Sequence, residues 1–430
     1  MLARVYSRIA IGFEKIARKI ISHKSLAVLI ILIGLYVLVR SIYFPENLNF
    51  SAEQGAFAKK SFELWRDKKI ELIGPAISFR SNGRMIFQGS ITYYFQWLFL
   101  LPGRFDPVIS SYLFMLFGAA MLIPLYFGVK NLGDEKKAIF VCAIYAFLPL
   151  YIDYSRFFWN PNYQFVLTPL VIWFTSIYVK DRKRLWLFFE SLLLGILLLF
   201  HYQYFVVIGM FLMFHLTDKK FGLKEIAIFT VGIILGFFPM ILFELRHNFY
   251  NIRTILMFLE EKNNVFLQGG GFDKNHYYLS ISLCALVFFI SIKNIKLNWI
   301  FVGVLGLFLF ALSLFKVSSK PTHGFGMSAN WNYPLELKAN EIIRSSKIRD
   351  YNVANLIYNT KASVQKYLLK IHNVNIGEEN YTTNTYLFII TDRTEPLSDP
   401  AYEVNWFKPS TLIQDWNLND QYFLYLFKRN

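Results

Sequence analysis

Long apolar runs separated by short polar segments fill the chain as far as about residue 316. A helix needs about 20 apolar residues to cross a bilayer. The pattern therefore predicts nine transmembrane helices, at 26–44, 107–128, 138–154, 162–179, 184–200, 203–216, 223–243, 276–292 and 297–316. The apolar segment 90–102 ends in Pro102 and is too short for this set. We expect it to dip into the membrane without crossing.

Basic residues between the runs predict the orientation of the chain. Cytoplasmic loops of membrane proteins carry an excess of Lys and Arg. If 90–102 does not cross, the loops "KNLGDEKK", "KDRKR", "TDKK" and "KNIK" all face the cytoplasm. If it crosses, all four move outside, where such loops are disfavoured. We therefore expect the N-terminus inside and, because the number of spans is odd, the C-terminus outside.

Polar segments flank the apolar region on both sides. Residues 1–25 combine basic residues with apolar residues at helical spacing, which predicts an amphipathic helix on the cytoplasmic surface. Residues 317–430 alternate helix-like and strand-like patterns, which predicts a small extracytoplasmic α/β domain. The expected fold is a mainly α, polytopic membrane protein. Its transmembrane domain spans 26–316 and includes a large first outer loop at 45–106.

Composition supports the membrane class. Hydrophobic residues make up 55% of the 430 residues and charged residues only 17%, against about a quarter in soluble domains. The net charge of +16 lies in short clusters between apolar runs, unlike the patch of a nucleic-acid binder. Cys142 and Cys284 lie within apolar runs and are expected to be small buried hydrophobes. We find no phosphate-binding loop, metal-binding spacing, nucleophile elbow or dinucleotide motif, which disfavours nucleotide-dependent enzymes and metalloproteases.

The stretch "NFSAEQGAFAKK" (49–60) follows the first apolar run and contains one carboxylate, Glu53. One interpretation is a surface carboxylate near a helix N-terminus, which the helix dipole favours by a few tenths of a kcal/mol. The other is a general base at the membrane interface, because an ionised Glu can accept a proton from a hydroxyl at neutral pH. The residues alone leave both interpretations open.

Several outer segments carry cations. Arg80 and Arg84 follow in the first outer loop, and Arg246 lies with Glu244 and His247 after a later span. Such arginines can be ordinary loop charges, or they can bind a phosphate with two parallel hydrogen bonds. Arg246 can also form an ion pair with Glu244 that braces the loop.

The turn "YSRFFWNPN" joins two predicted spans. Asn160 and Asn162 can cap the turn and the next helix, while Arg156 and Trp159 can act as interfacial anchors. His201 ends another span. A single histidine at a helix end is more often a hydrogen-bonded structural residue than a catalyst.

Taken together, these motifs resemble the GT-C superfamily of membrane glycosyltransferases. The resemblance is to the family-39-like group, related to protein O-mannosyltransferases and to the aminoarabinose transferases of lipid A. It covers about three quarters of the chain. The stretches that carry it are "EQGAFA" (53–58), "GP" (74–75), "QGSITYY" (88–94), "SRFFWNPN" (155–162) and "FELRHNFYNIR" (243–253).

The chain departs from the family pattern at several positions. Glu53 stands where the family usually has Asp, which keeps the carboxylate and moves it by one methylene. Ala56 and Phe57 replace the usual Arg and Asp, so the motif has no second acid. Gln88 and Ser90 replace His and Pro. These changes bear on which sugar and which acceptor are used.

The resemblance implies a hexosyl- or pentosyltransferase that takes its sugar from a polyprenyl-phosphate donor at the outer leaflet. Glu53 would deprotonate an acceptor hydroxyl of a glycan, lipid or protein, and the anomeric carbon would invert. It implies no cofactor, and it leaves a divalent metal ion open. The candidates for binding the donor phosphate are, in order, Arg246, Arg80, Arg84 and Arg156. The candidates for binding substrate are Tyr93, Tyr94, Asn160, Asn162, His201 and His247.

Two other functions remain open. A transporter or lipid flippase typically has ionisable residues near the bilayer midplane and often inverted repeats. In this sequence the charges gather at span ends, and we find no repeat. A non-catalytic membrane scaffold with an outer partner-binding domain has no need of a carboxylate beside a set of arginines.

Overall fold

The structure is a computed structural model. It describes residues 24–430 except 82, 261–273, 294, 375 and 377–380. The amphipathic helix expected at 1–25 therefore lies outside the described residues, apart from its last two positions.

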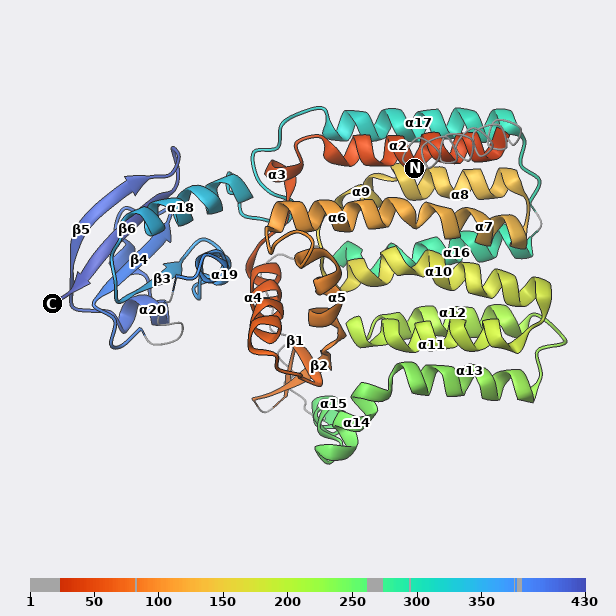
Figure 1. The fold of residues 1–430 in the computed structure, drawn as a ribbon, viewed down its shortest axis with the longest axis horizontal. Coiled ribbons are helices and arrows are strands. Elements are labelled where there is room, and N and C mark those ends of the chain that lie inside the picture. The colour runs from red at the N-terminus through yellow and green to blue at the C-terminus, as the bar shows by residue number, and fades with distance from the viewer. Residues whose placement is uncertain (1–23, 82, 261–273, 294, 375, 377–380) are drawn as a thin grey trace, which may run out of the picture.

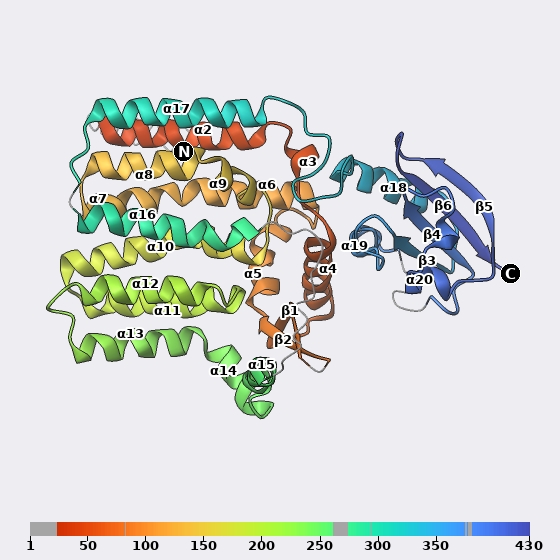
Figure 2. The same cartoon turned by 180° about the vertical axis from the view of Figure 1, so that it is seen from behind.

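A bundle of helices that lie side by side forms the larger part of the molecule (Figures 1 and 2). Each of the nine predicted spans coincides with helical structure. The helices are α2 (Lys24–Ser41), α6 (Pro107–Ala120), α7 (Leu122–Leu132), α8 (Glu135–Phe147), α9 (Pro149–Tyr154), α10 (Asn160–Asp181), α11 (Arg184–Phe200), α12 (Tyr204–Leu216), α13 (Leu223–Gly236), α16 (Leu279–Ile292) and α17 (Trp299–Val317).

Length and composition identify four membrane-spanning candidates among the described helices, or five if a bent pair counts as one. The bent pair is α13 and α14 (Phe238–Arg246), whose axes differ by 65°. Pro239 lies at the start of α14 and cannot donate a backbone hydrogen bond, which explains the break. The chain is thus a multi-pass membrane protein, and the count of nine crossings stays a prediction.

Glycines let two helices of the bundle approach very closely. A Cβ on Gly195 of α11 would lie 2.3 Å from the Ile233 carbonyl oxygen, and one on Gly236 of α13 would lie 2.2 Å from the Leu192 carbonyl oxygen. Only hydrogen fits at these contacts. Small residues that bring helix backbones together are a typical solution inside a membrane, where water provides no hydrophobic drive between helices.

The segment predicted to be the first outer loop covers one end of this bundle (Figure 1). It forms α3 (Phe44–Asn47), α4 (Ala52–Asp67), an antiparallel hairpin of β1 (Ile73–Ser81) and β2 (Arg84–Gly89), and α5 (Ile91–Leu100). Helix α5 has ten residues, about 15 Å at the helical rise. That is half the hydrocarbon core of a bilayer, so α5 is too short to cross, as the sequence predicts for 90–102. Helix α15 (Tyr250–Glu260) packs against the hairpin.

The C-terminal part contains a mixed sheet beyond the first outer loop. Its strand order is β3-β4-β6-β5, with β3 and β4 parallel and the other pairs antiparallel. The elements are α18 (Tyr333–Ser345), β3 (Tyr351–Asn355), α19 (Ser363–Ile371), β4 (Tyr386–Thr391), α20 (Tyr402–Asn405), β5 (Ser410–Asn417) and β6 (Phe423–Arg429). Strand β4 is buried on both faces, because Phe388 and Ile390 join one hydrophobic cluster while Leu387 and Ile389 join another.

A buried carboxylate lies in the first turn of α18. Glu336 accepts hydrogen bonds from the indole of Trp331 at 2.5 Å, from the Tyr358 hydroxyl and from the Gln365 amide. Its burial raises the pKa of Glu336 to about 7, against the lowering effect of these three bonds. The carboxylate therefore ties the linker before α18 to the elements that follow it.

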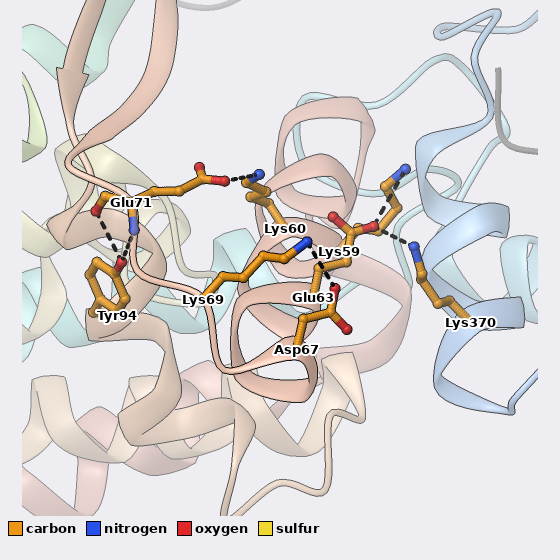
Figure 3. A network of polar contacts seen from close by, with 8 residues as sticks. All are labelled: Lys59, Lys60, Glu63, Asp67, Lys69, Glu71, Tyr94 and Lys370. Atoms are coloured by element: carbon orange, nitrogen blue, oxygen red, sulfur yellow. Dashed lines mark hydrogen bonds and ion pairs between the residues drawn. The ribbon is translucent and has the colours of Figure 1, made fainter.

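Helix α19 docks on α4 and joins the C-terminal part to the first outer loop. A Cβ on Gly55 would lie 2.9 Å from a methyl carbon of Val364, so the two helices touch at this glycine. Lys370 of α19 pairs with Glu63 of α4, next to the Lys60–Glu71 pair (Figure 3). This contact helps to fix α4, the helix that begins beside Glu53.

Candidate functional site

Glu53 lies in the first turn of α4. Ser51 caps the helix: its backbone N–H donates to Gln54 Oε1 at 3.4 Å, and its one hydroxyl hydrogen is shared between Gln54 Oε1 at 2.9 Å and Asn49 Oδ1 at 3.1 Å. Trp159 donates from its indole Nε1 to Glu53 Oε2 at 2.8 Å. Burial raises the pKa of Glu53, and the bond from Trp159 partly opposes that rise. The site thus contains a half-buried carboxylate with a shifted pKa and one fixed partner.

The turn between α9 and α10 presents Trp159. Asn162 donates to the Phe157 carbonyl oxygen at 2.9 Å, which closes the turn. Arg156 is buried and donates from Nη2 to the carbonyl oxygens of Val39 and Ile42 at 3.0 and 3.3 Å, at the end of α2. Burial lowers the pKa of Arg156 to about 10. Arg156 therefore ties the turn to α2.

Strand β2 is brought to the same place by three side chains. Asn160 donates to Gln88 Oε1 at 2.5 Å. Asn251 of α15 pairs with both backbone polar groups of Phe87, at 2.9 and 3.1 Å, and the Tyr202 hydroxyl donates to the Phe87 carbonyl oxygen at 2.5 Å. These bonds hold the hairpin against the helix ends beside Trp159.

Two histidines extend the site away from Glu53. The ring of His276 meets Trp159 edge to face with centroids 4.7 Å apart, and the His201 ring lies 6.1 Å from His276. His201 Nδ1 accepts from the Gln203 backbone N–H at 3.3 Å. Burial and the nearby His276 lower the pKa of His201 to about 3. A neutral His201 with Nδ1 as acceptor carries its proton on Nε2, which leaves one N–H donor there.

The expected phosphate-binding cations lie in different settings. Arg84 is exposed at the start of β2, with its guanidinium carbon 6.0 Å from the Tyr250 ring centroid. Arg246 is exposed at the end of α14, and no described residue forms a hydrogen bond or ion pair with its side chain. Glu244 instead accepts from the first backbone N–H groups of α15 at 3.2 and 3.4 Å. Arg80 lies on β1, and its side chain falls outside the described part of the chain.

The remaining substrate-binding candidates have other described contacts. Tyr94 accepts from the Glu71 backbone N–H at 2.7 Å and donates to the Glu71 carbonyl oxygen at 3.0 Å (Figure 3). Tyr93 is buried against Phe57, with ring centroids 6.3 Å apart. His247 is exposed and stacks on the ring of Phe243 at 4.4 Å. Contacts through Trp159 and its neighbours connect Glu53 with Asn160 and His201, and Tyr93 packs one helical turn from Glu53, whereas the described contacts of Tyr94 and His247 lie elsewhere.

Sequence reasoning did not select three residues of this group. The sequence predicts only an interfacial anchor at Trp159, although this residue stands in the motif that resembles the family. Gln88 was noted only as a departure from the family, and His276 was hidden at the start of a predicted span. No group of three or more His, Cys, Asp or Glu side chains in the described ranges is placed to hold a metal ion.

Comparison with known proteins relates this geometry to a family. Residues 90–243 match the family model described as dolichyl-phosphate-mannose-protein mannosyltransferase. No curated protein matches the chain. The fold is similar to that of ArnT from Cupriavidus metallidurans, solved with undecaprenyl phosphate bound, with a TM-score of 0.57 and 9% identity over 92% of this chain and 97% of that one.

Weaker likenesses involve the oligosaccharyltransferase of Archaeoglobus fulgidus. One structure, tethered to an acceptor peptide, has a TM-score of 0.38 and 11% identity over 76% of this chain and 44% of that one. Another, with an inhibitory peptide and a dolichol-phosphate, has a TM-score of 0.38 and 12% identity over 69% and 37%. The fold assignment rests on the first likeness. The chain thus has the fold of ArnT, and its residues 90–243 match the mannosyltransferase family model.

Proposed function

We propose that the chain transfers a sugar from a polyprenyl-phosphate-linked donor to an acceptor hydroxyl, with Glu53 as the general base. The observation that carries the proposal is the half-buried Glu53 carboxylate, held by Trp159 at 2.8 Å. Burial raises the pKa of Glu53 in the direction of neutral pH. A general base works best when its pKa lies near the operating pH, because it is then ionised and still binds a proton well. ArnT, whose fold the chain shares, is bound to undecaprenyl phosphate in its crystal structure.

The proposed reaction is a single displacement. The acceptor hydroxyl gives its proton to Glu53 while its oxygen forms a bond to the anomeric carbon. The bond from that carbon to the phosphate oxygen breaks, and the polyprenyl phosphate leaves with the electron pair. Because attack and departure occur on opposite faces, the anomeric configuration inverts.

The leaving phosphate gains negative charge and needs donors at that moment. Arg84 and Arg246 are exposed on the side of the hairpin and α14, and both can turn to a phosphate. Arginine is well suited to this task because its planar donors match phosphate oxygens. His201 can add a neutral N–H, because its pKa of about 3 keeps the imidazole uncharged at neutral pH. Arg156 is the weakest of the candidates, since it already binds the end of α2.

The proposal includes an orientation. The end of the bundle that carries Glu53 and the C-terminal sheet faces outwards, and the basic loops at the opposite end face the cytoplasm. This orientation places the base at the interface where a polyprenyl phosphate presents its head group. The displacement as written uses no metal ion.

The test is transfer of radiolabelled sugar from polyprenyl-phosphate donors in membranes that contain Glu53→Gln or the wild type. The variant keeps the size of the side chain and removes the proton acceptor, so transfer should fall by about 10²–10⁴-fold. Protein level and donor binding should change little. Glu53→Asp should keep part of the activity, because it restores a carboxylate set back by one methylene.

A matched control is Glu71→Gln in the same outer loop. It removes an equal charge whose pair with Lys60 is about one-third exposed, and such pairs contribute at most about 1 kcal/mol. Its transfer rate should match the wild type. A wild-type rate for Glu53→Gln would show that the base lies elsewhere or that the chain is not a transferase of this kind.

A further inference from the structure

A cavity of about 680 Å³ lies away from the hairpin side of the site. The ends of α2, α9 and α17 surround it, together with residues 318–326 of the linker that leads to α18. We call it the linker cavity. Its volume falls within the usual range for small-ligand pockets, about 300–1,000 Å³. The proposed function assigns no substrate or residue role to the linker cavity.

The side chain of Asn49, in the wall of the linker cavity, has an amide donor without a described hydrogen-bond partner. The residue is 1% exposed. Its Oδ1 accepts from Ser51 Oγ at 3.1 Å, while its Nδ2 has no hydrogen-bond partner among the described residues. Buried donors are almost always paired. An oxygen atom of a ligand in the cavity would accept a hydrogen bond from Asn49 Nδ2.

The rest of the lining decides which class of ligand fits. Tyr154, Phe157 and Phe325 form an aromatic wall, with ring centroids 5.2 Å apart for Tyr154–Phe325 and 6.1 Å for Phe157–Phe325. Amide and hydroxyl groups of Asn47, Ser319 and Thr322 also line the space. Aromatic rings can pack on the C–H face of a sugar ring while amides and hydroxyls bind its hydroxyl groups.

The charges in the lining do not favour an anion. Lys316 forms an ion pair with Asp153 and also donates to a backbone carbonyl oxygen. Lys320 pairs with Glu46 at 3.4 Å. Both lysines already face carboxylates, so the cavity has little net attraction for a phosphate. A neutral carbohydrate fits this wall better than an anionic group.

Two connections join the linker cavity to Glu53. Asn49 hydrogen-bonds to Ser51, the residue that caps α4 just before Glu53. Phe157 stacks on Trp159, the donor to Glu53, with ring centroids 6.3 Å apart. The cavity therefore adjoins the candidate base.

The linker cavity and the two exposed arginines lie towards opposite ends of α4. In Figures 1 and 2, α3 and the end of α17 lie beyond one end of α4, and the hairpin, α14 and α15 lie beyond the other. We propose that the linker cavity binds the acceptor as a neutral sugar, an inference that rests on the proposed function. The acceptor hydroxyl then reaches Glu53 from one side and the donor phosphate leaves on the other, as an inverting displacement requires.

The first test is sugar binding, which does not depend on activity. Saturation-transfer NMR on the full-length protein in detergent uses methyl glycosides of glucose, galactose, mannose and N-acetylglucosamine as probes. Ser319→Trp places a large ring in the cavity. The neighbouring Ser318→Trp is the matched control, because Ser318 is exposed and does not line the cavity. At least one glycoside should give a signal that Ser319→Trp removes and Ser318→Trp keeps.

A second variant guards against misfolding of the first. Asn49→Asp keeps an oxygen that can accept from Ser51 and replaces the unpaired donor with an acceptor. It should lose the glycoside signal while it binds undecaprenyl phosphate as the wild type does. The absence of any glycoside signal, or signals that persist in both Ser319→Trp and Asn49→Asp, would overturn the assignment.

Transfer assays separate this inference from the proposed function. If both hold, Ser319→Trp abolishes transfer and keeps undecaprenyl-phosphate binding. Glycoside binding without any transfer by the wild type would refute the proposed function and uphold the cavity as a carbohydrate site. Transfer at the wild-type rate by Ser319→Trp would show that the acceptor binds elsewhere.

Discussion

The bond from Trp159 to Glu53 leads to a specific pH prediction. Trp159→Phe removes the indole N–H and keeps an aromatic ring in the same place. The carboxylate then stays half-buried but loses the indole donor that, among the described residues, favours its charged form. The pKa of Glu53, already raised by burial, should rise further.

The size of the shift follows from the strength of the lost bond. Hydrogen bonds to charged groups contribute about 1.5–3 kcal/mol, and one pKa unit corresponds to about 1.36 kcal/mol. The pKa of Glu53 should therefore rise by roughly one to two units in the variant. A general base must be ionised, so transfer is lost as the pH falls through this pKa. The acidic limb of the pH–rate profile should move to higher pH by the same amount.

The assay measures sugar transfer under kcat/KM conditions between about pH 4 and pH 9, because kcat/KM reports the free enzyme. Trp97→Phe is a matched control. Trp97 donates from its indole to the Ser61 carbonyl oxygen at 3.0 Å, so that variant loses a similar bond to an uncharged acceptor. Its profile should keep the wild-type midpoint. A Trp159→Phe profile with an unmoved midpoint and only a lower plateau would refute the assignment of Glu53 as base.

Three further predictions concern other parts of the molecule. Arg246→Ala should weaken undecaprenyl-phosphate binding about tenfold or more, the cost of one charge-assisted hydrogen bond, and unchanged binding would remove Arg246 from the phosphate site. Glu336 has a pKa of about 7, raised by burial, so its neutral form favours folding and the stability of the C-terminal part should fall by about 3 kcal/mol as the pH rises from about 4.5 through 7. Pulse proteolysis should detect this loss, and Glu336→Gln should remove it. Lys183→Cys and Asp350→Cys should react with a membrane-impermeant thiol reagent from opposite sides, and labelling of both from the same side would contradict the topology.

Hydropathy predicts the helix bundle because the membrane imposes a length on each apolar run. The predicted span at 162–179, for example, lies within α10, and the span at 184–200 matches the bounds of α11. Polar contacts between helices inside the bundle could not be predicted from the sequence. Glu190 lies inside a predicted span, yet it is buried and hydrogen-bonded to His215 of the next helix at 2.8 Å. Hydropathy averaged over a whole predicted span does not reveal a buried polar pair such as Glu190 and His215.

The C-terminal part shows a similar limit. Strands β3, β4 and β6 follow apolar patterns that the sequence displays clearly, whereas β5 does not. Strand β5 is an edge strand and most of its side chains are exposed, so no buried face selects apolar residues there.

Contacts within the candidate site depend on distant segments. Glu53 could be named from its position after the first span. Its partner Trp159 lies 106 positions away in the chain, and Gln88 lies 72 positions from Asn160. Single-residue patterns report burial and local conformation, but they contain no information about which polar groups meet across such separations.

The docking of α19 on α4 has a consequence for biosynthesis. Lys370 and Glu63, which pair across this contact, lie 307 positions apart in the chain. At about 5–20 residues per second, the ribosome needs roughly 15–60 s to cover that distance. During this interval the nascent chain already contains Glu53, while the surface of α4 at Gly55 still lacks its partner Val364. The candidate active site therefore reaches its final packing only after residue 370 has been made and α19 has folded against the first outer loop.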